Sequence, residues 1–133
     1  MPTRNGHKST EVYKKRAKYW EQGLIENKKK AEGTMYDEDD GGRCCLAVAQ
    51  DIACARSKKT KEAIEGNEEV DHEMPHIAVA RYFGWKSRNP EIGHKSICAS
   101  EHNDGEEALD GRVTLKPKTH NQIAKLIKSE WGI

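Results

Sequence analysis

The chain has 133 residues, a length that suits one domain with one hydrophobic core. Hydrophobic residues make up 35% of it and charged residues 34%, which predicts a small core beneath a highly charged surface. Lys and Arg number 23 against 22 Asp and Glu, so a formal charge of +1 gives the molecule as a whole no drive toward nucleic acid or anionic membranes.

The distribution of apolar residues predicts neither a membrane span nor a secretory signal. No apolar run approaches the roughly 18 residues that a spanning helix needs, and the N-terminus lacks an apolar signal core. Four cysteines without an export signal indicate reduced thiols, so we expect a cytoplasmic protein.

Composition divides the chain into a leader, a globular part and an insertion. Residues 1–9 are polar, which predicts a flexible leader, and residues 10–133 are expected to form a single globular domain. Within that domain, residues 56–72 are rich in Lys and Glu, which indicates a solvated insertion with a helix at most in its first half.

Two amphipathic helices are predicted in the first half of the chain. The first runs from about Thr10, a favourable N-cap, to about Lys30. Its apolar stripe recurs with helical spacing at Tyr13, Ala17, Trp20 and Leu24. After a possible short strand over 34–36, the second helix spans about 44–55. Its inward face is formed by Cys45, Val48, Ala49 and Ile52.

Further helices are predicted in the second half. Met74-Pro75 opens the third helix, because proline suits a first turn, and Gly84 closes it. Ser96 is expected to cap a short helix that ends near His102.

The last segments complete the predicted architecture. Residues 113–115 read as extended, and Thr119 with Gln122 forms a capping box that begins the last helix. The fold class is therefore mainly α (small α+β). We expect a compact bundle of about four to five helices with at most a short β-hairpin.

Three segments carry a resemblance to a known family. They are Cys44-Cys45-Leu46-Ala47-Val48 with Asp51; Met74-Pro75, Val79 and Tyr82-Phe83-Gly84-Trp85 with Asn89-Pro90; and His102-Asn103-Asp104-Gly105 with Ile123-Ala124-Lys125-Leu126-Ile127. In these segments, over about residues 18–131, the chain resembles an uncharacterised family of small bacteriophage and prophage proteins. That family has Cys-Cys-Leu-Gly-Val, then Leu-Pro with aromatic-Leu-Gly, and then Leu-Asn-Asp-x-Gly with Ile-Ala-x-Leu-Ile.

The chain departs from the family pattern in two places. Ala47 replaces a glycine, and several residues are inserted between Gly105 and the last helix. The resemblance implies a phage origin and a common fold, so the cytoplasm expected from the reduced thiols would be that of a host cell. It brings no established activity.

The cysteines allow two interpretations. A thiolate at a helix N-terminus beside Arg43 would be reactive, and Cys98 with His102, four residues apart, could join Cys44 or Cys45 at a zinc ion. Buried free cysteines also pack as small hydrophobic residues. We favour packing, and we predict no metal and no cofactor.

Polar residues near the predicted helices also have structural explanations. Asp51, set among apolar neighbours, needs a partner such as an arginine. Asn103 and Asp104 can face a cleft or simply form a turn. Lys14, Lys15 and Lys18 can contact phosphates or form a solvated face.

Because no catalytic motif appears, we expect a protein that is not an enzyme. The preferred hypothesis is a phage-type binding protein that antagonises host defence by sequestering a small anionic, nucleotide-like signalling ligand. Such a ligand is expected at the start of the second helix. The residues expected to bind it are Arg43, Cys44, Trp85, Asn89, Asn103 and Asp104. The alternative is an inhibitor that binds a host macromolecule, such as a CRISPR effector or its nucleic acid, through charged surfaces.

Overall fold

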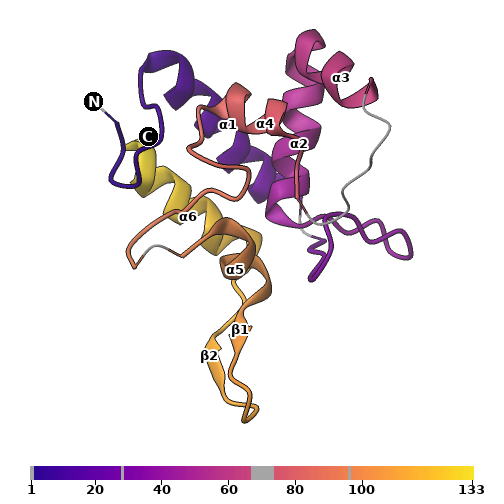
Figure 1. The fold of residues 1–133 in the computed structure, drawn as a ribbon, viewed down its shortest axis with the longest axis vertical. Helices are drawn as coiled ribbons and strands as arrows, with labels where there is room; N and C mark the ends of the chain where they lie inside the picture. Colours follow the sequence, from indigo (N-terminus) through magenta and orange to yellow (C-terminus); the bar gives the residue numbers. More distant parts are fainter. Residues whose placement is uncertain (1, 28, 67–73, 96) are drawn as a thin grey trace.

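The computed structural model describes residues 2–27, 29–66, 74–95 and 97–133, which form six helices and one two-stranded sheet (Figure 1). The helices are α1 (Glu11–Glu26), α2 (Cys45–Arg56), α3 (Lys58–Glu65), α4 (Ile77–Phe83), α5 (Ala99–Asp104) and α6 (His120–Trp131). The strands are β1 (Glu106–Glu107) and β2 (Val113–Leu115). The prediction of a mainly α fold with a short hairpin is confirmed.

One hydrophobic cluster draws on the amphipathic faces of the helices. Residues from four helices belong to it or pack against its edge: Trp20, Cys45, Val48, Ile52, Phe83, Ile123 and Ile127. Helix α1 packs on α6 and α2, and Gly23 of α1 sits where a Cβ would lie 2.5 Å from the Ile52 side chain. A glycine at this position therefore permits the close approach of α1 to α2.

Helix α2 is buried in its first half, where it belongs to the core. Its residues from Cys45 through Ala49 are all buried. The Trp20 Nε1 atom donates a hydrogen bond of 2.9 Å to the carbonyl oxygen of Cys45, which ties α1 to the first turn of α2. The spacing of apolar residues thus predicts the inward face of α2 correctly.

An aromatic cluster fills the space between α1, α4 and the loop after α4. The Trp85 ring stacks on Phe83 with centroids 4.9 Å apart, and it lies 4.8 Å from Trp20. Trp131 of α6 meets the edge of Trp20 at 6.3 Å. These four rings connect the middle of the chain to its C-terminal helix.

Residues 2–9 pack against the helices, whereas composition predicts a flexible leader. His7 is 1% exposed and stacks on Trp131 with centroids 5.4 Å apart. Lys8 donates its N–H to the Gly84 oxygen at 2.9 Å, and its own carbonyl oxygen accepts a bond from Trp131 Nε1 at 3.1 Å. Burial of the His7 ring and these backbone bonds hold the segment in place.

Several element boundaries differ from the prediction. Helix α1 ends at Glu26 rather than near Lys30, because Lys30 instead forms a bridge with Arg43. Helix α4 begins at Ile77, with His76 rather than Met74-Pro75 at its start. The predicted strand at 34–36 reduces to a single bridge of Tyr36 with Arg43.

Local sequence signals set other boundaries as expected. The capping box of Thr119 and Gln122 begins α6, and Gly84 ends α4 in the left-handed conformation with φ +72°.

The Lys/Glu-rich stretch contributes α3, whose Thr60 is buried, while 67–73 lie outside the described residues. Ser96, expected to cap α5, also lies outside them, and Cys98 occupies the N-cap position.

The β1–β2 hairpin projects away from the helical body, below α5 in Figure 1. The same view places the two chain ends close together beside α6. In the part of the chain that the structure describes, no helix combines the length and apolarity needed to cross a membrane.

Candidate functional site

The start of α2 is where the sequence predicts a ligand, and here protein groups bond its backbone. Cys44 is the N-cap, and its sulfur accepts a hydrogen bond from the Ala47 N–H at 3.4 Å. The Cys45 N–H donates to Asn103 Oδ1 at 3.0 Å. The Asn103 side chain therefore stands at the position expected for an anion.

Asn103 is completely buried and links three segments. Besides accepting from Cys45, it donates from Nδ2 to the Ala31 oxygen and to Asp104 Oδ1, each at 2.7 Å. Asp104 in turn accepts from the Gly33 N–H at 3.1 Å. The structure thus brings Asn103 and Asp104, which are the last two residues of α5 and not the expected turn, to the Cys44–Cys45 segment, with hydrogen bonds between protein groups closing the gap.

The Arg43 side chain interacts with neighbouring residues of the protein. Its Nε lies 2.9 Å from Asp51 Oδ2, its Nη1 donates to the Gly41 oxygen at 3.0 Å, and its guanidinium covers the Tyr36 ring at 4.8 Å. The expectation that Asp51 pairs with an arginine is confirmed. Tyr36 donates to the same carboxylate at 3.0 Å. Burial, followed by the Asp51 charge, raises the pKa of its hydroxyl well above the ordinary value.

The thiols are free and at least partly buried. Burial raises the pKa values of Cys44 and Cys45, so both are protonated near neutral pH, and burial also raises the pKa of Cys98 to about 11. His102 directs Nε2 at the Ile92 oxygen, 2.9 Å away. Among the residues that the structure describes, no three His, Cys, Asp or Glu side chains are grouped closely enough to hold a metal ion.

Among the described residues, the side chains of Trp85 and Asn89 form no hydrogen bond with the start of α2. Trp85 belongs to the aromatic cluster, and its Nε1 has no hydrogen-bond partner within the described part of the chain. Asn89 exchanges two hydrogen bonds with Ser100, of 2.7 and 3.1 Å. Both residues hold the loop after α4 in place.

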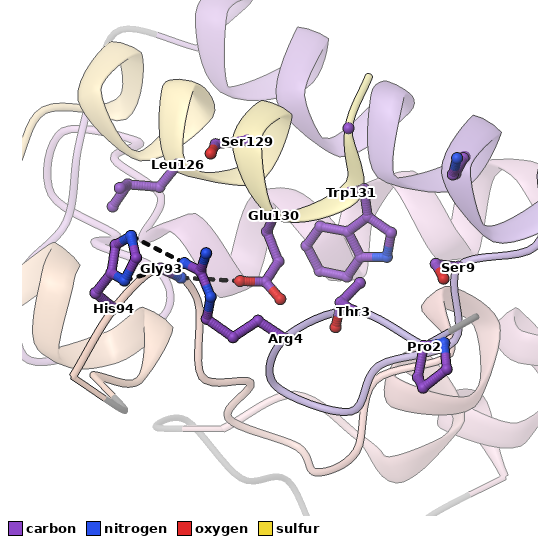
Figure 2. A pocket seen from close by; sticks show the side chains of 12 residues that line it. Pro2, Thr3, Arg4, Ser9, Gly93, His94, Leu126, Ser129, Glu130 and Trp131 are labelled. Carbon is purple, nitrogen blue, oxygen red and sulfur yellow. Dashed lines mark hydrogen bonds between the residues drawn. The ribbon is translucent and has the colours of Figure 1, made fainter.

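A concave opening lies elsewhere, between the N-terminal segment and the C-terminal half of α6 (Figure 2). This terminal hollow has a volume of about 620 Å³. It is lined by Pro2, Thr3, Arg4, Ser9, Lys14, Gly93, His94, Leu126, Ser129, Glu130, Trp131 and Gly132. Its residues come from both ends of the chain and from the loop before α5.

The N-terminal turn and the loop before α5 form two walls of this hollow. Residues 3–7 close a turn in which Thr3 and His7 exchange hydrogen bonds of 3.0 Å, so that Arg4 projects from its outer side. Glu130 anchors this turn to the loop before α5, because its carboxylate accepts from Asn5 Nδ2 at 2.8 Å and from the Gly93 N–H at 3.0 Å. The Glu130 carboxylate is therefore engaged by amide donors.

Among the described residues, the arginine and lysine of the terminal hollow form no ion pair, although Glu130 lines the same hollow. Arg4 Nη1 lies 2.9 and 3.1 Å from the two ring nitrogens of His94, side by side in Figure 2. Across the described residues, neither Arg4 nor Lys14 forms an ion pair with a carboxylate. A group of cations around a concave surface favours the binding of an anion.

Sequence patterns contain no signal for this arrangement. Arg4 falls in a segment whose composition predicts flexibility, and His94 is 90 residues away in a loop. The stacking of His7 on Trp131 and the hydrogen bonds of Asn5 and Gly93 with Glu130 bring them together.

Comparisons with known proteins add no relative. No family model, no curated protein and no solved structure matches the chain.

Proposed function

We propose that this chain is a non-enzymatic binding protein that takes a small anionic, nucleotide-like ligand into the terminal hollow. The observation that carries the proposal is the convergence of Arg4, Lys14 and His94 on one concave surface without a carboxylate partner for Arg4 or Lys14. Glu130 also lines the hollow, but among the described residues it forms no ion pair with Arg4 or Lys14, so an anion there would pair with these two cations.

The lining suits a ligand with an anionic end and an apolar body. Its volume of about 620 Å³ falls within the ordinary range of small-molecule sites, roughly 300–1,000 Å³. Leu126 supplies apolar surface, while the hydroxyl group of Ser129 can donate a hydrogen bond to a phosphate or a sugar.

The geometry supports binding better than catalysis. Both ring nitrogens of His94 face the Arg4 guanidinium, so this imidazole is not presented to a nucleophile as a general base. The Glu130 carboxylate accepts from backbone and side-chain amides and serves as an anchor.

The start of α2, which the sequence favours as the ligand site, has a weaker claim. Asn103 already accepts the hydrogen bond of the Cys45 N–H, and Asp51 already pairs with Arg43. A ligand would have to displace both interactions before it gained any of its own. We therefore place the ligand in the terminal hollow.

The biological setting of the proposal comes from the resemblance to small phage and prophage proteins. A phage protein that binds a signalling nucleotide made by a host defence system would lower its free concentration without any chemical step. In this setting tight binding alone is sufficient for function, which agrees with the absence of a catalytic motif in the sequence.

A ligand-capture experiment tests the proposal. The purified protein is incubated with a lysate of infected, defence-carrying cells, washed and heated, and the released small molecules are identified by mass spectrometry. We expect a phosphate-bearing compound from the parent protein and at least tenfold less from a variant that combines Arg4→Ala with Lys14→Ala. Equal recovery from both proteins, or recovery of no anionic compound, would contradict the proposal.

A further inference from the structure

A second basic hollow lies on another side of α1, against α3 and α4. Its volume is about 340 Å³. It is lined by Arg16, Ser57, Lys59, Thr60, Ala63, Ala78, Arg81 and Tyr82. Three helices thus direct one cationic residue each to the same concave surface, and the lining contains no Asp or Glu.

The charges of this helical hollow differ from those of the rest of α3. Lys58 and Lys61 lie within 3.8 and 3.9 Å of Glu62 and Glu65, one helical turn away. Lys59, which faces the hollow, forms no such pair within the described part of the chain. The lysine charges on the outer face of α3 are thus paired with glutamates, whereas the charge of Lys59 in the hollow is not. An external anion could pair with the charges in the hollow.

Two arginine–tyrosine stacks fix the guanidinium groups beside this hollow. The Arg16 guanidinium lies 4.3 Å from the centroid of the Tyr82 ring, and its Nη1 donates a hydrogen bond to the backbone carbonyl oxygen of Tyr82 at 2.7 Å. Arg56 covers the Tyr19 ring at 3.4 Å. The second stack lies next to the hollow, because Arg56 directly precedes Ser57, which lines it.

Arg56 is exposed, and its guanidinium carbon lies over the Tyr19 ring. A planar guanidinium supported in this way can stack against a nucleobase. The arrangement combines a cationic hollow for phosphates with a neighbouring flat platform.

We propose that this face, formed by Arg16, Arg56, Lys59 and Arg81, binds single-stranded nucleic acid. Phosphate groups occupy the helical hollow, and an unstacked base lies on Arg56. A duplex keeps its bases stacked and would leave the platform unused, whereas a phosphopeptide would occupy the hollow and leave the platform without a role. This inference does not depend on a ligand in the terminal hollow.

The first test compares two variants with the same loss of charge. A fluorescein-labelled twelve-residue oligothymidylate is titrated with protein, and binding is followed by fluorescence anisotropy between 50 and 200 mM salt. Lys59→Ala with Arg81→Ala should lower affinity about tenfold, and the slope of log affinity against log salt should shrink by roughly 1.4, about 0.7 for each lost phosphate contact. Lys58→Ala with Lys61→Ala, on the outer face of α3, should change affinity less than twofold.

The second test addresses the base. Arg56→Lys keeps the charge and removes the plane, so affinity for oligothymidylate should fall about fivefold. Affinity for an abasic deoxyribose-phosphate oligomer of the same length should not change.

Four results would overturn the inference. They are equal losses from the two double variants, no binding of the parent at 50 mM salt, an Arg56→Lys variant that binds oligothymidylate like the parent, and tighter binding of a phosphoserine peptide than of oligothymidylate. Circular dichroism melting of each variant establishes that the exposed substitutions leave the fold intact.

Discussion

Asn103 illustrates how one buried side chain can take the place of a ligand. It closes the first turn of α2 by accepting from the Cys45 N–H, and it reaches Ala31 through its amide nitrogen. The sequence places this asparagine in a turn between α5 and the hairpin, where a local role is the ordinary expectation. Its long-range role could not be predicted, because the bonded residues are 58 and 72 positions away.

Replacing Asn103 with alanine should therefore destabilise the protein. The change leaves a buried N–H of Cys45 and a buried carbonyl of Ala31 without partners, which we expect to cost about 3 kcal/mol of unfolding free energy. Urea denaturation followed by circular dichroism measures this loss. Asn121→Ala, an exposed position on α6, is the matched control and should cost less than about 1 kcal/mol. Similar losses from the two variants would show that Asn103 is not a structural link.

At the scale of elements, hydrophobic period and capping chemistry predict the helices well. The capping box at Thr119 and the left-handed glycine at position 84 set boundaries through local interactions alone. The end of α1 depends instead on a distant segment. The backbone of Lys30 forms a β-bridge with that of Arg43, and the Lys30 Nζ donates hydrogen bonds to the carbonyl oxygens of Asn103 and Lys118. Helical propensity near Lys30 is overruled by these tertiary contacts.

Helix α2 provides the sharpest test of the predicted core. Val48 is 4% exposed, so Val48→Asp buries a carboxylate without a partner, and we expect the loss of about 4 kcal/mol or more to unfold the protein. Ala55→Asp in the same helix lies at an exposed position and should leave cooperative unfolding in place. Thermal melts followed by circular dichroism compare the two. A cooperative melt of Val48→Asp near the parent temperature would contradict the burial of α2.

At the scale of the whole molecule, the ends of the chain make the candidate site. The N-terminal turn packs on α6 through His7 and Trp131, and Glu130 joins it to the loop before α5, which gives Arg4 its place beside His94. Composition predicts flexibility for residues 1–9 because it registers their polarity and not the stacking of one histidine. The core was therefore predictable from periodicity, whereas the terminal hollow required contacts between opposite ends of the sequence.

The whole molecule should also lose stability in mild acid. Burial lowers the pKa values of His102 and His120, so both are neutral in the folded protein at pH values where the unfolded chain begins to bind protons. The unfolded state then holds more protons, and the unfolding free energy must fall as pH drops below the ordinary histidine value of about 6.5. Urea denaturation between pH 7.5 and 5.5 measures this slope. His102→Gln should flatten it, and an unchanged slope would show that His102 does not contribute.

The central claim is that an anionic, nucleotide-like ligand binds in the terminal hollow. The most direct measurement is a titration of isotope-labelled protein with adenosine triphosphate, followed through backbone amide NMR shifts. The account predicts saturable shifts that include Lys14, Gly93, His94 and Gly132 and that disappear in the variant combining Arg4→Ala with Lys14→Ala. Arg43→Ala should leave them unchanged. Saturable shifts confined to Cys45, Leu46 and Asn103, or no saturable shift at the hollow, would contradict it.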